Sequence, residues 1–533
     1  MKNYLNLFLC VWALLLMAAC NNQKEVHKIT VNTRQPVLPV LANKEKNKVL
    51  AIRFNIPEDS VPGEVRVKSF TFGFKGTTQT DDIAEALVLY ASEDDFSRAS
   101  LFGSVTDIGP RAKVTGEQYL DSGEHYFWLA VRLKGTPDLL HKIGAQLTHV
   151  GLDDKNEILE IAQEPSKPQR IGIAVRQKHD DGADTYRIPG LATTNKGALI
   201  AVYDVRYNNS ADLQEDIDVG MSRSTDGGQT WENMKIIMDM KEYGGRPQDE
   251  NGIGDPAVLV DRKTNTIWVA ALWLSGNKGK RAWNASKPGM TPEETGQFVL
   301  VKSEDDGLTW SDPINITPQI KDPDWQLFFN GPGSGITMKD GTLVFAAQYK
   351  DKDKVPYSTI IYSRDGGKTW HVGTGAKSDT TEAQVVELSD GSLMLNMRDN
   401  RNHQGRKDSL NGRSVAITRD MGKTWAEHPT SRKALQESTC MASIIEVDVA
   451  GKNSVLFFSN PDSRAARDHI TIKASIDDGM SWPQENQLEI YEENTYGYSC
   501  LTQVDKDHAG ILYEGRGDLY FQKIPIEDIF SGL

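Results

Sequence analysis

Four carboxylates gather in one short stretch, RYNNSADLQEDIDVG, at residues 206–220. They are Asp212, Glu215, Asp216 and Asp218. A carboxylate that reaches a reacting oxygen can donate and then accept a proton, which is general acid–base chemistry. Asp218 alternates with Ile217 and Val219, as a strand residue does, whereas Asp212 lies in the more polar, loop-like part. The pattern therefore favours Asp212 over Asp218 for chemistry in a loop.

A repeated phrase indicates which elements position such residues. The pattern [Ser/Thr]-x-Asp-x-Gly-x-[Thr/Ser]-Trp occurs five times, with its aspartates at positions 226, 305, 365, 420 and 477. Gly accepts positive φ and Asp can bond nearby backbone N–H groups, so each phrase reads as a turn. A strand-like segment precedes every copy, which predicts a hairpin. Units of roughly 40 to 60 residues are the size of a four-stranded propeller blade.

The region that carries the phrase, residues 170–533, is long enough for six blades, although only five have a copy. The sixth is expected from the C-terminal segments CLTQV, GILYEG and DLYFQKI. A strand around IGIAV, at 171–175, would close the ring and so remove exposed sheet edges. We therefore expect an all-β chain whose larger domain is a six-bladed β-propeller.

The preceding region, 28–165, carries no copy of the phrase. It contains short β-like segments such as KVLAIRFNI, RVKSFTFGF and HYFWLAVRL, separated by turns rich in Pro, Gly and Asp. This pattern predicts a β-sandwich of jelly-roll type. Tyr126 and Trp128 could form a solvent-facing platform for a sugar, and the alternative is that they belong to the core.

The chain has 533 residues and a formal net charge of −14, which argues against a nucleic-acid partner. Residues 1–20 read as an export signal, with Lys2 before a short apolar stretch. The ending MAAC resembles a bacterial lipoprotein signal, which implies a lipid on Cys20 and a place in the outer membrane or periplasm. Simple secretory cleavage is the alternative. Cys440 and Cys500 are expected to be buried free thiols, and Cys and His show no metal-ligand spacing.

The segment TYRIPG at 185–190, followed by the five phrases, resembles the bacterial exo-α-sialidase (neuraminidase) family with Asp-box (BNR) repeats. The resemblance covers 170–533 and implies a six-bladed propeller. It also implies a retaining enzyme that hydrolyses terminal α-linked sialic acids from glycans or glycoproteins, without a metal or organic cofactor.

The resemblance implies a clamp of three arginines for the carboxylate of sialic acid: Arg187, Arg398 and Arg467. Arginine suits this task because its planar fork bonds carboxylate oxygens in pairs and stays charged. Arg464 competes with Arg467 for the third place, and the distance to the following Asp-box favours Arg467.

The resemblance also assigns the reacting groups. Tyr498 matches the family's nucleophile, and Glu382 its paired base. A neutral phenol avoids the repulsion that a carboxylate nucleophile would meet from the carboxylate of the substrate. Tyr496 would share a strand face with Tyr498 and is the competing tyrosine. Asp212 lies 25 residues after Arg187, the family's spacing for the acid/base.

Further positions follow from the same resemblance. Arg206 and Asp255 are expected near the C4 group of the substrate, and Glu514 is expected to orient Arg187 from behind. Trp273 and Trp283 are candidate walls of an N-acetyl pocket, and we expect at least one of them to be core.

Three other functions remain open. A trans-sialidase, or an enzyme that releases an anhydro product, would share every catalytic residue named above. A non-catalytic Asp-box propeller that binds protein or glycan would not need three arginines. A glycosidase for a neutral sugar would have no use for them either.

Overall fold

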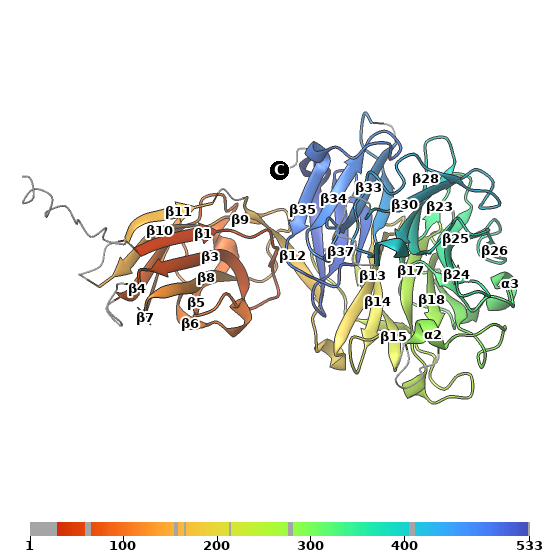
Figure 1. Cartoon of the computed structure of the whole chain (residues 1–533), viewed down its shortest axis with the longest axis horizontal. Coiled ribbons are helices and arrows are strands. Elements are labelled where there is room, and N and C mark those ends of the chain that lie inside the picture. Colours follow the sequence, from red (N-terminus) through yellow and green to blue (C-terminus); the bar gives the residue numbers. More distant parts are fainter. Residues whose placement is uncertain are drawn as a thin grey trace, which may run out of the picture.

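The computed structural model describes residues 29–58, 65–153, 158–164, 167–212, 215–274, 281–403, 411–452 and 454–530. The expected signal segment 1–20, with Cys20, lies outside these residues. Among the described residues, no helix combines the length and apolar character that a membrane span requires. Figure 1 shows two bodies, a smaller one formed by the first strands and a larger fan of sheets.

The smaller body consists of two sheets. The six-stranded sheet contains, in spatial order, β11 (Ile158–Gln163), β1 (Ile29–Arg34), β3 (Asn47–Ile56), β8 (Gly123–Leu133), β5 (Ile83–Ala91) and β6 (Ser100–Val105). The three-stranded sheet contains β10 (Gln146–Leu152), β4 (Val65–Gly73) and β7 (Arg111–Leu120). Phe54, Phe70 and Phe127 are fully buried and pack together between the sheets, with ring centroids 4.9–6.1 Å apart. The two layers therefore form a sandwich around an aromatic core.

Of the two alternatives for Trp128, the structure shows the core position and not a solvent-facing sugar platform. Its side chain is 2% exposed and packs against Leu87, Leu89 and the edge of Phe96. The short segment Phe96–Arg98 covers the face of the sheet that strand alternation left free, which is why Trp128 lies in a second, smaller core. Tyr126 stacks on Trp128 and donates its hydroxyl to Glu124 at 2.6 Å.

The larger body contains six sheets among the described residues, and these are the six predicted blades. Blade 1 is β13 (Thr185–Thr193), β14 (Leu199–Arg206), β15 (Ile217–Ser224) and β16 (Lys235–Met238). Blade 2 is β17 (Ile253–Val260), β18 (Ile267–Trp273), β19 (Gln297–Ser303), β20 (Ile314–Asn315) and β22 (Gly333–Ser334). Blade 3 is β21 (Leu327–Asn330), β23 (Ile336–Thr337), β24 (Leu343–Lys350), β25 (Pro356–Ser363), β26 (His371–Val372) and β27 (Lys377–Ser378).

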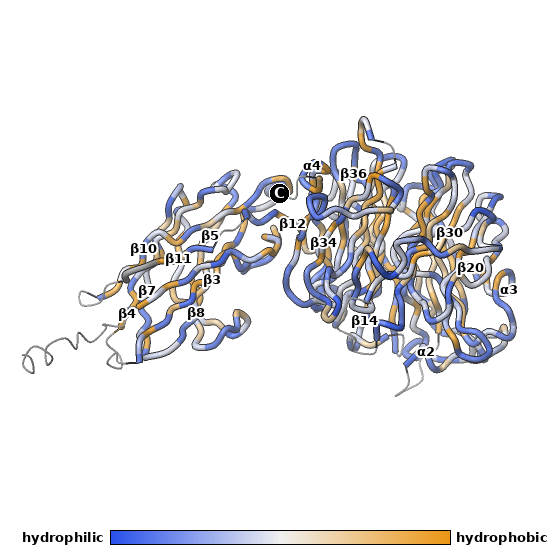
Figure 2. The backbone as a smooth tube through the Cα atoms, turned by 45° about the horizontal axis from the view of Figure 1, so that its top comes forward, coloured by the Kyte–Doolittle hydropathy of each residue, from blue (hydrophilic) through white to orange (hydrophobic). Residues whose placement is uncertain are grey.

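Blade 4 is β28 (Thr380–Glu387), β29 (Leu393–Asp399), β30 (Ser414–Thr418) and β31 (Ala426–Glu427). Blade 5 is β32 (Ser443–Val447), β33 (Val455–Pro461), β34 (Ile470–Ser475) and β35 (Gln487–Tyr491). Blade 6 is β36 (Ser499–Asp505), β37 (His508–Glu514), β38 (Leu519–Pro525) and β12 (Gln169–Arg176). The helices α2 (Ala282–Ala285), α3 (Thr317–Ile320) and α4 (Ile526–Phe530) are single turns. Hydrophobic segments follow the strands of both bodies in Figure 2.

The ring closes as the sequence predicts. Blade 6 lacks an Asp-box, and β12 from the start of the propeller pairs antiparallel with β38 from its end, with Ile173 opposite Phe521. The same β12 also pairs with β2 (Val40–Leu41) and β9 (Lys142–Ile143), which precede it in the chain. The outer edge of blade 6 is therefore the junction between the two bodies (Figure 1).

Each Asp-box is a clamp for its own hairpin. In the first box, Asp226 accepts bonds from the Ser224 hydroxyl at 2.8 Å, the Thr230 amide at 2.9 Å and the Thr230 hydroxyl at 2.5 Å. The Ser224 hydroxyl in turn accepts the Gly228 amide at 3.0 Å. The same bonds recur in the other four boxes. These aspartates therefore have a structural role: they stabilise the turns of the hairpins.

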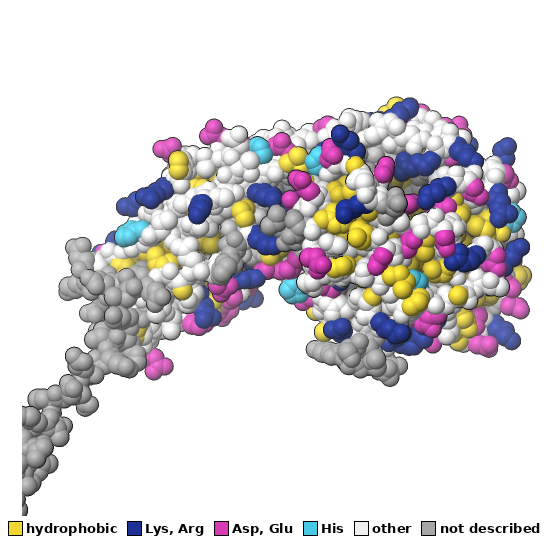
Figure 3. Space-filling view, turned by 90° about the horizontal axis from the view of Figure 1, so that it is seen from above, with side chains coloured by type: hydrophobic (Ala, Val, Ile, Leu, Met, Phe, Trp, Pro, Cys, Tyr) yellow, Lys and Arg dark blue, Asp and Glu magenta, His cyan; other side chains and the backbone are white. Residues whose placement is uncertain are grey.

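The face of the molecule in Figure 3 carries Lys and Arg side chains interspersed with Asp and Glu. The two described cysteines, Cys440 and Cys500, are buried free thiols, as expected.

Candidate active site

The first strands of blades 4, 5, 6, 1 and 2 contact one another in turn, and blade 3 contacts β28 through β24. Residues at the starts of the first strands therefore meet at one end of the ring. Arg187 lies near the start of β13, Glu382 near the start of β28, and Tyr498 directly before β36. Arg398 comes from the end of β29, which is the strand antiparallel to β28. Blades 1, 4 and 6 thus contribute to one site.

Tyr498, Glu382 and Arg398 contact one another through their side chains. The phenol donates a hydrogen bond to Glu382 Oε1, and Arg398 Nη1 lies 2.6 Å from Glu382 Oε2 and 3.1 Å from the phenol oxygen. Burial, and then the charge of Glu382, raises the pKa of Tyr498 well above its ordinary value, against the opposing effect of Arg398. The resting phenol is therefore protonated, and an acceptor for its proton is already in contact with it.

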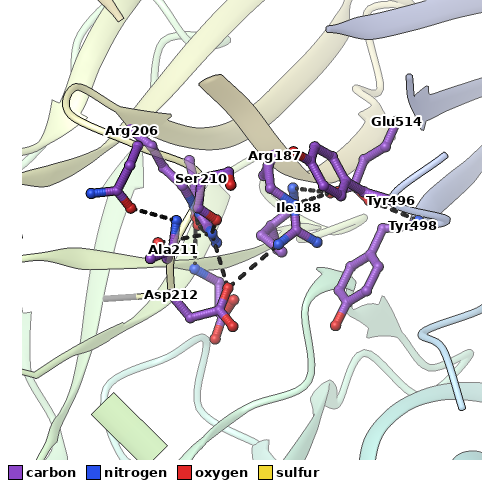
Figure 4. Close-up of polar contacts among 12 residues, drawn as sticks. Arg187, Ile188, Arg206, Ser210, Ala211, Asp212, Tyr496, Tyr498 and Glu514 are labelled. Atoms are coloured by element: carbon purple, nitrogen blue, oxygen red, sulfur yellow. Dashed lines mark hydrogen bonds and ion pairs between the residues drawn. The ribbon is translucent and has the colours of Figure 1, made fainter. Parts of the chain in front are cut away.

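Glu514 organises the opposite side of Tyr498. This fully buried carboxylate accepts Arg187 Nε at 3.1 Å and the Ile188 amide at 2.9 Å through one oxygen. Its other oxygen accepts the Tyr498 amide at 2.9 Å. Ile188 has φ of 58°, a strained conformation for a β-branched residue. Glu514 thus fixes Arg187 and the backbone of Tyr498 with one side chain (Figure 4).

Arg467 completes a ring of three guanidinium groups. It donates to the Tyr496 carbonyl at 2.9 Å and to the Thr439 carbonyl at 3.0 Å. Its guanidinium lies 5.6 Å from the Tyr498 ring centroid, and that of Arg187 lies 5.4 Å from it. Arg464 is exposed, and its carbonyl accepts a bond from the Asn411 side chain. Three arginines converging on one phenol favour an anionic ligand.

Tyr496 is more than a competing tyrosine. Its ring lies 4.5 Å from the Arg187 guanidinium, closer than the ring of Tyr498. Stacking on an aromatic face orients the planar arginine side chain. The alternation of Tyr496 and Tyr498 in the sequence is the signal that could have pointed to a shared contact with Arg187.

Asp212 lies in the loop between β14 and β15, with its side chain 61% exposed. It accepts Arg206 Nη1 at 2.9 Å and Arg187 Nη1 at 3.4 Å (Figure 4). Desolvation alone would raise the pKa of Asp212, but Arg206 and then Arg187 outweigh that effect and hold it below its ordinary value. Asp218 lies in β15, is 3% exposed and accepts the Tyr207 hydroxyl at 2.8 Å. Of these two aspartates, Asp212 is therefore the one that solvent can reach.

Arg206 holds the loop that carries Asp212. Its side chain is 1% exposed, and its Nε and Nη2 donate to Asp204 Oδ2 at 3.1 and 2.7 Å. Its Nη1 also donates to the carbonyls of Ser210 at 2.6 Å and Ala211 at 3.0 Å. Sequence reasoning missed Asp204, although a charged residue in the apolar strand LIAVYDVR, two positions before Arg206, is a usable signal.

Asp255 lies beside the same carboxylates. It is in β17 with φ of 56°, and its amide donates to Asp204 Oδ1 at 2.8 Å. Burial, followed by repulsion from Asp204, Glu382 and Asp212, raises the pKa of Asp255 well above its ordinary value. A raised pKa favours the protonated form of Asp255, which could donate a hydrogen bond to a neighbouring acceptor.

The two candidate tryptophans differ. Trp273 is fully buried and packs edge-on against Tyr243, so it is core. Trp283 is half-buried, with Lys350 Nζ 4.6 Å from its ring centroid. Within the described ranges, His, Cys, Asp and Glu form no group of three that could hold a metal ion.

Comparisons with known proteins identify the family of the chain. The family described as "BNR repeat-like domain" matches residues 188–485, and the "N-terminal domain of BNR-repeat neuraminidase" matches residues 28–156. A sialidase of Bacteroides fragilis (strain YCH46) is 44% identical over 529 residues, which cover 94% of this chain and 96% of that protein. A sialidase of Micromonospora viridifaciens is 32% identical, over 64% of this chain and 51% of its own.

Solved structures give the same result. The Hadza microbial sialidase Hz136 has a TM-score of 0.86 at 43% identity, and the match covers 93% of this chain and 100% of that one. A Trypanosoma rangeli sialidase in a covalent complex with 2,3-difluorosialic acid has a TM-score of 0.53 at 21% identity, over 66% of this chain and 57% of its own; it supports the fold alone. With six blades, five Asp-boxes and a 44% identical relative along nearly its whole length, the chain belongs to the family of bacterial BNR-repeat exo-α-sialidases.

Proposed function

We propose that the protein is a retaining exo-α-sialidase that releases terminal α-linked sialic acid from glycans or glycoproteins through a covalent intermediate on Tyr498. The observation that carries this proposal is the hydrogen bond from the Tyr498 phenol to Glu382 inside a ring of three arginines. A phenol is a weak nucleophile until a base takes its proton, and Glu382 is in place to take it.

Substrate binding prepares the acid. The carboxylate of sialic acid would bond Arg187, Arg398 and Arg467 and so displace Asp212 from its 3.4 Å contact with Arg187. Losing that cationic partner raises the pKa of Asp212 toward the range of a useful general acid. Asp212 keeps its contact with Arg206, which holds its loop in place.

Two displacements complete the reaction. In the first, Tyr498 oxygen bonds the anomeric carbon as its proton passes to Glu382, and Asp212 protonates the departing glycosidic oxygen. In the second, Asp212 takes a proton from water, the water oxygen bonds the anomeric carbon, and Tyr498 leaves and recovers its proton from Glu382. Two inversions give net retention.

The test is Tyr498→Phe, with Tyr496→Phe as the matched control. Tyr498→Phe removes the nucleophile and leaves the arginines in place, so we expect turnover to be abolished or rerouted to the opposite anomer while a sialoside still binds. Tyr496→Phe keeps the aromatic face on Arg187 and should retain most of the activity. Steady-state rates and calorimetric binding check both variants. Wild-type hydrolysis by Tyr498→Phe would contradict the assignment.

Transfer or anhydro-product formation would use the same groups. The fold does not separate these outcomes, because a Ruminococcus gnavus intramolecular trans-sialidase and the Trypanosoma rangeli sialidase both resemble this chain with a TM-score of 0.53. The mass of the released sugar distinguishes a hydrolysis product from an anhydro sugar.

A further inference from the structure

The N-terminal sandwich bonds the propeller just ahead of Tyr498. Both Nη atoms of Arg34 pair with the Glu492 carboxylate, at 2.7 and 2.5 Å. The Val37 amide donates to the same carboxylate at 3.1 Å, and the Glu492 amide donates to the Val37 carbonyl at 2.9 Å. Lys48 pairs with Glu493 at 2.5 Å. Side-chain and backbone bonds from the sandwich thus fix the residues that follow β35.

The chain then runs from Glu492 to Tyr498 without entering a strand. The Thr495 amide donates to the Arg467 carbonyl at 2.8 Å, and Arg467 Nη1 donates to the Tyr496 carbonyl. Because no strand ladder holds this stretch, its position depends on these bonds and on the bonds that hold Glu492.

A second contact holds the loop that follows Glu514. Lys44 Nζ pairs with Asp518 at 2.5 Å, and their side chains are 26% and 12% exposed. In the same loop, the Gly517 carbonyl accepts the amide of Tyr186 at 3.1 Å. Tyr186 directly precedes the first clamp arginine, so this loop backs both that arginine and Glu514.

The two segments are also bonded to each other. Arg516 donates to the carbonyl and the side-chain oxygen of Asn494 at 3.1 and 3.0 Å. The Tyr496 amide donates to the Gly515 carbonyl at 3.4 Å. Residues 492–498 and 514–518 therefore form one unit, called the support below. The sandwich bonds the support at Glu492 and Glu493 and again at Asp518.

We propose that the sandwich holds the nucleophile half of the active site in register, with Arg34 and Lys44 as positioning residues. The proposal rests on the role of Tyr498 given above. Tyr498 and Glu514 are backed by this support, whereas Glu382 stands on blade 4. The sandwich thereby sets the distance between the nucleophile and its base.

The expected effect falls on catalysis more than on stability. The Arg34 side chain is 51% exposed, and exposed ion pairs contribute little to folding. A misplacement of about 1 Å at a reacting group, by contrast, can cost about 100-fold in rate. A loss of kcat without a matching loss of stability is the signature of positioning.

The experiment compares Arg34→Ala/Lys44→Ala with Lys142→Ala in the full chain. Lys142 also bridges the two bodies, but it pairs with Asp528 in α4 at 3.3 Å and not with residues of the support. We expect kcat of the double variant to fall about tenfold, within the range that misplacement produces, with a smaller change in KM. Lys142→Ala should keep the wild-type kcat. Equal kcat in all three proteins would overturn the proposal.

Labelling with 2,3-difluorosialic acid, followed by intact mass, separates positioning from partial unfolding. The double variant should label completely but about tenfold more slowly, in proportion to kcat. Incomplete labelling at the wild-type rate would overturn the proposal, because it means fewer folded sites rather than displaced ones. If the wild-type enzyme turns over substrate yet never labels on Tyr498, the proposed nucleophile fails instead.

A double-mutant cycle tests the named contact. Glu492→Gln and Arg34→Ala both break the same pair, so we expect the combined variant to lose no more kcat than the more impaired single variant. Strictly additive losses would show that the two residues act separately and would contradict the assigned route.

Discussion

At the scale of single residues, the site sets two proton carriers in opposite states. Tyr498 keeps its proton because burial and Glu382 raise its pKa, whereas Asp212 loses its proton because Arg206 and Arg187 outweigh desolvation. In the proposed mechanism, both protonation states change during the first displacement. The carboxylate of the substrate can change the state of Asp212, since it competes with Asp212 for Arg187, whereas Glu382 is the group in contact with the phenol that can take the proton of Tyr498.

The role of Asp212 can be tested with leaving groups of different basicity. Asp212→Asn cannot protonate a departing alkoxide, so cleavage of a natural sialoside should fall by about 100- to 10,000-fold. Cleavage of an activated aryl sialoside should fall far less, because its leaving group departs without a proton. Glu215→Gln, in the same loop, is the control and should leave both rates near wild type. An equal loss on both substrates with Asp212→Asn would contradict the acid/base role.

At the scale of elements, the Asp-box aspartates stabilise their hairpins, although a carboxylate could also act in catalysis. The bonds of Asp365 to the Thr369 amide and hydroxyl lower its pKa to about 2. Because folding lowers the pKa of Asp365, the ionised side chain stabilises the fold at pH values above its unfolded-state pKa of roughly 4. This stability is lost as the pH falls toward the folded-state pKa.

Asp365→Asn should therefore lower the free energy of unfolding by about 1 kcal/mol at pH 7, with kcat unchanged. The deficit should shrink as pH falls from about 4 to about 2, because the wild-type carboxylate becomes protonated there. Urea unfolding midpoints measure the effect, with Asp353→Asn, an exposed change outside the box, as the control. A deficit that grows toward pH 2 would show that Asp365 is not held as a carboxylate.

The repeats made blade number and ring closure predictable, because each box reports its hairpin locally. The fork between Arg206 and Asp204 and the stack of Tyr496 on Arg187 were not foreseen, since both depend on how separate strands face one another. Strand alternation alone left both a solvent-facing and a core position open for Trp128, because it does not reveal that a later segment covers the second face of the sheet.

At the scale of the whole molecule, β12 of the propeller pairs with β2 and β9, and Lys44 and Lys142 form ion pairs with Asp518 and Asp528. Lys44 and Asp518 are 474 residues apart in sequence, so no local pattern could have announced their contact. In the proposed account, the N-terminal body thus helps to position the residues of the site.

We also propose that the protein is exported and anchored by a lipid on Cys20, on the basis of the MAAC ending of the signal segment. Cells producing the wild-type chain should incorporate labelled palmitate into it and retain it in the membrane fraction. Cys20→Ser should lose both properties, while Cys10→Ser, inside the removed segment, should keep them. Equal labelling of Cys20→Ser and wild type would rule out this anchor.

A double displacement through Tyr498 is tested most directly by proton NMR of the first sugar released from an α-sialoside. We predict that α-sialic acid appears first and only later equilibrates to the β-anomer. Initial release of the β-anomer would mean a single displacement by water, and the tyrosyl intermediate would have to be abandoned.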